Sequence, residues 1–203
     1  LLAKQAARIT GFFDELDPLV YRRTRDSLHA ELTRVCEQIR QPGASTGAFQ
    51  SVSGLAIDSS SNVYVSDSLL NRIQVFEKDK VGLPCVPTRQ PGSCGFVKEI
   101  FVERDTLGSG STWDVDVSPD RRQRFLFNPD GTNQYVWTLE RLSGQILDRF
   151  GRNGRNAGQF HWVHNLAIDS KGNMYTAEVD TGKRIQKFRP ADDHGRGRGR
   201  DDD

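Results

Sequence analysis

One pattern occurs twice in this chain, and this repeat constrains the fold more than any other feature of the sequence. The first copy spans residues 47–76 and the second spans 158–188. The copies align without a gap over their first two thirds, and one extra residue in a turn of the second copy restores the register up to Phe76 and Phe188. Internal similarity on this scale is a signature of a repeat architecture.

Within each copy, short apolar runs alternate with polar turns. In the first copy, Leu55-Ala56-Ile57 is apolar, Val63-Tyr64-Val65 combines β-branched and aromatic residues, and Ile73–Phe76 alternates. Short polar turns join only antiparallel neighbours, so each copy is expected to form an antiparallel meander. Such a meander cannot bury both faces alone, and copies stacked around an axis give a β-propeller.

We therefore expect a mainly β chain, a partial β-propeller of about three four-stranded antiparallel blades. The expected parts are a helical N-terminal segment at 1–43, the propeller segment at 44–190, and a disordered tail at 191–203 rich in Gly, Arg and Asp. The blades are expected at about 44–102, 107–150 and 158–188, with first-blade strands near 52–57, 62–67, 72–77 and 97–102. Arg189-Pro190 stops the third blade after three strands.

The N-terminal segment does not share the repeat. Its apolar residues recur at steps of three and four, which predicts amphipathic helices. Three interpretations remain open for this segment: packing on the blades, binding a partner or a second copy of the chain, or a sequence unrelated to the normal N-terminus of the domain.

Composition and cysteine usage place few limits on partners and compartment. The 203 residues carry 28 basic and 27 acidic side chains, a net charge of +1, so nucleic acid is disfavoured as a partner. No apolar run approaches the roughly 18 residues of a membrane span, and we expect no membrane partner. Cys85 and Cys94 flank a Pro/Gly-rich loop; a disulfide there would indicate an oxidising, extracytoplasmic compartment, and two unpaired thiols are the alternative. Localisation is otherwise unassigned.

The repeat resembles the NHL family of β-propeller repeats. Both copies start with Gly-x-Phe, continue with an apolar run ending in Asp and with Asn-x-Tyr, and end in Arg-Ile-Gln-x-Phe. The stretch from Leu107 through Phe188 also resembles bacterial NHL-repeat proteins with six-bladed propellers. The resemblance covers about residues 44–188 and implies a ring of about six blades, of which this chain supplies about three. It therefore also implies pairing with another half-propeller or a fragment of a longer chain.

The second copy has His161-Trp162-Val163-His164 where the first copy has Gln50-Ser51-Val52-Ser53. This exchange is where we expect any functional chemistry. The NHL resemblance includes the peptidyl-hydroxyglycine lyases, which hold zinc with histidines just ahead of inner strands. His164 falls on such a position, so it is a candidate metal ligand. The candidate ligand-binding residues are His161, His164, Glu178, Asp180 and Arg184.

Other charged residues recur in both copies, as structural devices should. We expect their carboxylates to accept turn N–H groups or to pair with arginines. These structural residues are Asp58, Asp67, Arg72, Asp169 and Arg184.

The favoured function is a non-catalytic binding scaffold for a protein or small ligand. One alternative is a zinc-dependent enzyme fragment of the lyase type. Another, since some NHL propellers bind RNA on a basic face, is an RNA-binding module. No cofactor is expected for the scaffold. Zinc would accompany the enzyme alternative, and calcium is the other metal left open.

Overall fold

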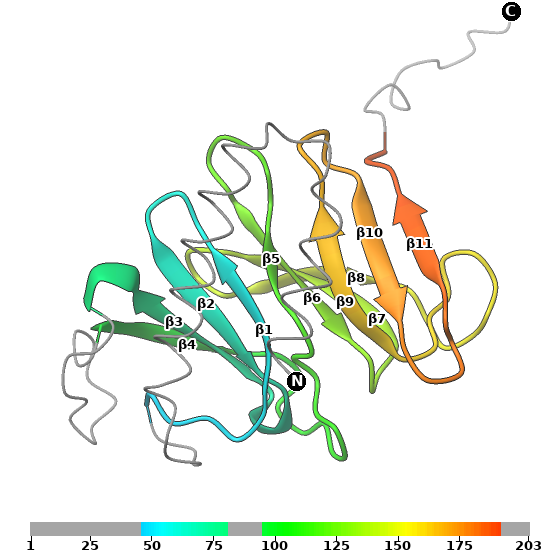
Figure 1. The fold of residues 1–203 in the computed structure, drawn as a ribbon, viewed down its shortest axis with the longest axis horizontal. Coiled ribbons are helices and arrows are strands. Elements are labelled where there is room, and N and C mark those ends of the chain that lie inside the picture. Colours follow the sequence, from blue (N-terminus) through cyan, green and yellow to red (C-terminus); the bar gives the residue numbers. More distant parts are fainter. Residues whose placement is uncertain (1–45, 81–94, 192–203) are drawn as a thin grey trace, which may run out of the picture. The chain divides into compact units, whose positions relative to one another are not determined.

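A computed structural model of the chain describes residues 46–80 and 95–191. The described part is mainly β, with three antiparallel sheets and two single-turn helices, η1 (Ser68–Leu70) and η2 (Lys78–Lys80) (Figure 1). The chain divides into unit 1, Leu1–Trp113, and unit 2, Asp114–Asp203. The predicted N-terminal helices, both loop cysteines and the tail from residue 192 lie outside the described residues.

Unit 1 holds one four-stranded meander, which we call blade 1. Its strands are β1 (Val52–Ile57), β2 (Asn62–Asp67), β3 (Arg72–Glu77) and β4 (Phe96–Phe101), hydrogen-bonded in that order. The first three match the predicted strands, and β4 begins one residue earlier than predicted. Pairing of Leu55 with Val65 and of Val63 with Phe76 puts the apolar positions on one face. There they form a core with Phe49 and Phe96.

Unit 2 holds two meanders. Blade 2 consists of β5 (Asp116–Val117), β6 (Phe125–Asp130), β7 (Tyr135–Glu140) and β8 (Ile146–Phe150). Blade 3 consists of β9 (Val163–Ile168), β10 (Met174–Glu178) and β11 (Ile185–Phe188), so the three strands predicted for it are those that the structure describes.

The inner strand of blade 2 is shorter than predicted. We expected it over 113–117, whereas β5 covers two residues. The reason is local, because Asp114 accepts the N–H of Val115 at 2.9 Å and Asp116 accepts that of Val117 at 2.7 Å. Side chains that bond the adjacent backbone in this way compete with the sheet ladder.

Blades 2 and 3 share one hydrophobic core in unit 2. Val136 of β7 packs with Val163, Leu166 and Met174 of blade 3. Phe150, Phe160 and Phe188 extend this core as a cluster of three rings with centroids 5.0–5.8 Å apart. The blade-like sheets are consistent with part of a propeller-like fold. None of the helices in the described residues has the length and hydropathy needed to cross a membrane.

Candidate functional site

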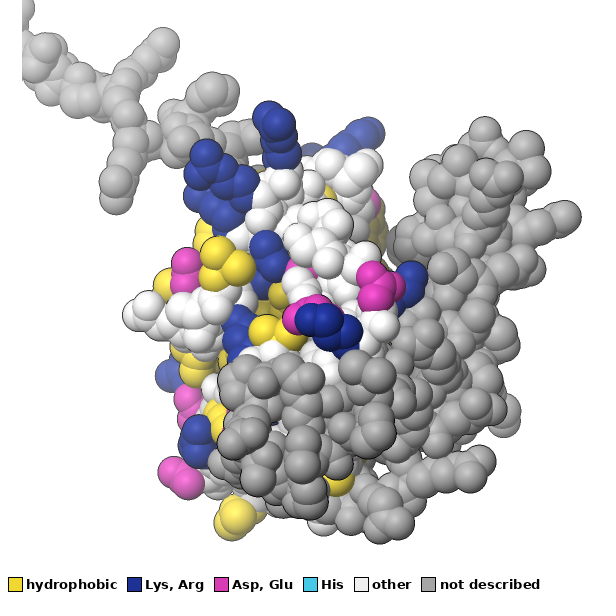
Figure 2. Space-filling model, turned by 90° about the vertical axis from the view of Figure 1, so that its left-hand side faces the viewer, with side chains coloured by type: hydrophobic (Ala, Val, Ile, Leu, Met, Phe, Trp, Pro, Cys, Tyr) yellow, Lys and Arg dark blue, Asp and Glu magenta, His cyan; other side chains and the backbone are white. Residues whose placement is uncertain are grey.

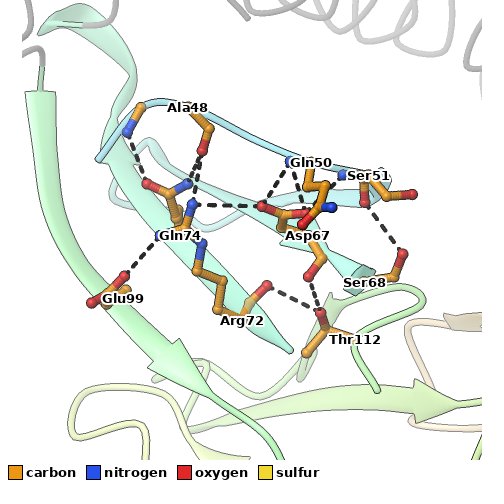
Figure 3. Close-up of polar contacts among 10 residues, drawn as sticks. Ala48, Gln50, Ser51, Asp67, Ser68, Arg72, Gln74, Glu99 and Thr112 are labelled. Atoms are coloured by element: carbon orange, nitrogen blue, oxygen red, sulfur yellow. Dashed lines mark hydrogen bonds and ion pairs between the residues drawn. The ribbon is translucent and has the colours of Figure 1, made fainter. Parts of the chain in front are cut away.

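A buried carboxylate and an arginine fasten the loop before β1 to blade 1 (Figure 3). Asp67, at the end of β2, accepts hydrogen bonds from the N–H groups of Gln50 at 3.1 Å and Ser51 at 2.8 Å. Arg72 lies 3.6 Å from the Asp67 carboxylate and donates to the carbonyl of Ala48 at 2.8 Å. The pair therefore satisfies backbone groups of this loop, together with Gln74, which also donates to the Ala48 carbonyl at 2.8 Å.

The second copy repeats this arrangement with a longer acid. Glu178, at the end of β10, accepts the N–H of His161 at 2.8 Å and the Nε–H of Arg184 at 2.6 Å. Gln186 donates to Glu178 and to the carbonyl of Gln159, each at 2.8 Å. Arg184 also donates to the carbonyls of Gly154, Arg155 and Gln159. These contacts give Glu178 and Arg184 a structural role in this loop.

The two inner-strand aspartates, Asp58 and Asp169, make the same turn in both copies. Each accepts the N–H groups two and four residues further on, at 2.9 Å. Each also accepts a tyrosine hydroxyl, from Tyr64 at 3.0 Å and from Tyr175 at 3.2 Å. The hydrogen bond from the Asn173 side chain is the main cause that lowers the pKa of Asp169. Both aspartates stabilise the turn through these hydrogen bonds.

The histidine-bearing segment departs from the first copy in its backbone. Trp162 has a φ of 58°, in the left-handed region that is rare for a bulky residue. Its N–H donates to the side chain of Gln134 in blade 2 at 2.7 Å, whereas the N–H of its counterpart, Ser51, is bonded to Asp67. The His161 ring lies edge-on to the Trp162 indole and bonds the Thr181 hydroxyl at 2.8 Å. Local strain of this kind motivates a functional hypothesis.

A chain of side chains leads from His164 to a buried carboxyl. His164 lies within β9, one residue past its start, and its Nδ1 is 2.7 Å from the Oδ1 of Asn165. The Asn165 amide donates to Asp114 at 3.1 Å. Burial lowers the pKa of His164, so its imidazole is neutral at pH 7.

Asp114 and Asp116 hold β9 through its backbone, and the sequence analysis did not select them. Asp114 accepts the N–H of Leu166 at 3.2 Å, and Asp116 accepts that of Ile168 at 3.0 Å. Burial raises the pKa of Asp114 to about 7 and that of Asp116 to about 6. The alternation Asp-Val-Asp-Val, which places two acids on one face of an inner strand, was the signal that could have found them.

The residues that the structure describes do not fit a zinc centre. A catalytic zinc site takes three protein ligands. Within residues 46–80 and 95–191, no group of three or more His, Cys, Asp or Glu side chains is placed to hold a metal ion. Asp180, the remaining candidate, lies exposed in the turn after β10. We therefore derive no step through a metal for His164.

Charge on the surface that Figure 2 shows is mixed in sign. Lys and Arg side chains there lie beside Asp and Glu side chains. A nucleic-acid-binding face gathers one sign of charge along the phosphate backbone. This part of the described surface gives no support to the RNA alternative.

Comparison with known proteins does not assign a family. No protein-family model and no curated protein matches the chain. Among solved structures, it is similar to a protein of unknown function from Bacteroides thetaiotaomicron, with 13% identity, a TM-score of 0.46, and 67% of this chain and 32% of that chain covered. It is also similar to a hydrazine synthase from Kuenenia stuttgartiensis, with 16% identity, a TM-score of 0.44, and 74% of this chain and 38% of that chain covered. A third similar structure is a provisionally assigned 6-phosphogluconolactonase from Bacteroides uniformis, with 12% identity, a TM-score of 0.47, and 71% of this chain and 38% of that chain covered. The chain thus spans between 32% and 38% of these chains, and similarity at this level carries no function over to it.

Proposed function

We propose that the chain is an NHL-type propeller segment that acts as a binding scaffold. The ligand, a polar group of a small molecule or a protein, contacts the blade end of unit 2 that carries His161, Trp162 and His164. The observation that carries this proposal is the strained backbone of Trp162, at the place where the two repeat copies exchange residues. The first copy forms its blade without that exchange, so the fold does not require it.

The groups at this end suit polar recognition. His161 and Trp162 are half-buried and offer an imidazole and an indole side by side. His164 is half-buried and neutral at pH 7, so it can donate or accept a hydrogen bond. A few convergent polar groups beside aromatic surface are typical of small-molecule sites. Gln134 and Asp114 fix the segment from blade 2, so the site rests on sheet elements and not on a free loop.

The repeat itself supplies the matched variant for a test. The triple substitution His161→Gln, Trp162→Ser and His164→Ser restores the residues of the first copy. We expect amide NMR shifts of the full chain, during a screen of small polar fragments, to cluster at Gln134 and over 161–165. The triple variant should retain the fold and lose those shifts.

A control substitution lies at the opposite end of the β9–β10 hairpin. Lys171→Gln changes an exposed turn residue there and should leave fragment binding unchanged. Fragments that bind the triple variant as tightly as the native chain would refute the proposed site.

A further inference from the structure

The third strand of blade 3 leaves one backbone edge without a sheet neighbour in the described part of the chain. In blades 1 and 2 a fourth strand, β4 or β8, pairs with the third. In blade 3 the order is β11-β10-β9, and β11 stands at the edge. Exposed edges of this kind are templates for pairing with another chain.

The hydrogen-bond pattern identifies the groups at that edge. Glu178 donates its N–H to the carbonyl of Arg184 at 2.9 Å, which marks this pair as a bonded pair of the ladder. Bonded and non-bonded pairs alternate between antiparallel strands. Ile185 and Lys187 therefore direct their N–H and C=O groups away from β10. Their counterparts in β3 face Ile100 and Lys98 of β4.

Side-chain exposure at the edge differs sharply from that in the other blades. Ile185 is 67% exposed, whereas its counterparts Ile73 of blade 1 and Val136 of blade 2 are fully buried. An apolar side chain that the other two blades bury is thus left in solvent beside open backbone groups. The combination of the two indicates a surface that binds an extended segment.

Charge along β11 indicates the kind of segment. Lys183, Lys187 and Arg189 lie on or next to the strand, and none of them pairs with a carboxylate of the described residues. Lys187 instead lies 5.0 Å from the centre of the Tyr175 ring. In blade 1 the fourth strand supplies an acid, because Glu99 of β4 pairs with Arg72 at 3.1 Å. A fourth strand for blade 3 should likewise bring carboxylates.

We propose that the β11 edge binds an extended, acidic segment of a partner protein as a fourth strand of blade 3. The backbone groups of Ile185 and Lys187 supply ladder hydrogen bonds, and the Ile185 side chain packs on an apolar residue of the segment. Lys183 and Lys187 attract its carboxylates. This surface is separate from the histidine-bearing segment, so each proposal can fail without the other.

A peptide derived from β4 tests the proposal on the full chain. The probe is the acetylated, fluorescent peptide Phe-Val-Glu-Glu-Ile-Phe, which is the β4 sequence with its lysine changed to glutamate. We expect saturable binding by anisotropy and slower amide hydrogen exchange at Ile185 and Lys187. The substitution Lys187→Glu should weaken binding by about threefold and reduce its salt dependence, as expected for an exposed ion pair. Arg121→Glu, at an exposed turn residue of blade 2, is the matched control.

Three outcomes would overturn the proposal. A peptide with proline at its third position cannot complete the ladder, so equal binding of that peptide would exclude strand addition. Peptide-induced protection confined to other residues would place the site elsewhere. Full protection of Ile185 and Lys187 in the peptide-free chain would show that the chain's own tail or a second copy occupies the edge; light scattering would distinguish the two.

Discussion

The two repeat copies share one backbone arrangement but differ in how deeply their acid–arginine pairs are buried. In the first copy Asp67 is fully buried and its partner Arg72 is 2% exposed. In the second, Glu178 is buried but Arg184 is 25% exposed. The first copy is therefore closed around its polar pair, whereas the second leaves its arginine, its third strand and its histidines in contact with solvent. Within the described chain, the residues shared by the two copies form the blade, and the departures from the repeat coincide with the surfaces that we propose bind partners.

The inner strands show the same contrast between the units. Register places Asp114 and Asp116 of blade 2 at the positions that Gly54 and Ala56 occupy in blade 1. Within the described residues, only unit 2 thus joins a buried carboxyl, Asp114, and a half-buried one, Asp116, to the backbone of the next blade. The two units should differ in how their stability responds to pH.

The largest expected effect is a loss of unit 2 stability as pH rises from about 4 to 8. A carboxyl whose folded pKa exceeds its unfolded value of about 3.9 binds its proton more tightly when folded, so its contribution disappears as pH rises through the folded pKa. For Asp114, with a pKa raised to about 7, the loss is about 4 kcal/mol. Asp114→Asn should remove most of it. Hydrogen exchange across unit 2 over this pH range provides the measurement.

Asp120 offers the opposite control in the same unit. The hydrogen bond from Ser118 lowers the pKa of this half-exposed carboxylate, so its small contribution is lost as pH falls. Asp120→Asn should therefore leave the loss between pH 4 and 8 intact. A unit 2 stability that stays level over this range in the native chain would contradict the buried-carboxyl account.

The next largest expected effect is a difference in stability loss when each of the two repeat arginines is removed. Arg72→Ala leaves Asp67 buried beside a vacated space and should destabilise unit 1 by about 3 kcal/mol. Arg184→Ala exposes Glu178 to water and should destabilise unit 2 by about 1 kcal/mol. Urea unfolding of the two variants, followed by amide exchange in each unit, measures the difference. Equal losses would show that burial does not distinguish the copies.

Much of this fold follows from local sequence chemistry. Leu55 and Val63 alternate with polar neighbours, and Asp58 with Asn62 predicts the turn between them, so β1 and β2 have the predicted bounds. Structural roles could be predicted for the acids and arginines of the repeat because residues of the same charge at the same positions of both copies point to a shared backbone need. These inferences depend on contacts between residues close in the chain.

The features that could not be predicted from the sequence depend on contacts between residues that are far apart in the chain. Asp114 meets Leu166 across a separation of 52 residues, and Gln134 meets Trp162 across 28. No local pattern encodes these pairings, because each polar group takes a partner that packing brings to it. Trp162, with its positive φ, is itself a partner in such a pairing. The candidate site in unit 2 could therefore be predicted only in part, from its histidines.

The smallest expected effect concerns a residue that both copies place in the left-handed region. Asn71 has a φ of 54° and its counterpart Lys183 a φ of 46°. The Asn71 side chain donates to the carbonyls of Arg104 and Thr106, both at 2.9 Å, and so is adapted to the position. Lys183 is exposed, and the left-handed conformation costs a lysine about 1 kcal/mol.

Lys183→Gly should consequently stabilise unit 2 by about 0.5 kcal/mol, because relief of that cost exceeds the added flexibility of the unfolded chain. Asn71→Gly relieves little and removes four hydrogen bonds, two donated by the Asn71 side chain and two that it accepts from Ser111, so it should destabilise unit 1 by about 2 kcal/mol. Thermal unfolding of the two glycine variants gives the sign directly. If both variants lose stability, the turn of the second copy is held by its lysine as firmly as the turn of the first is held by its asparagine, and the second copy is less open than its exposure indicates.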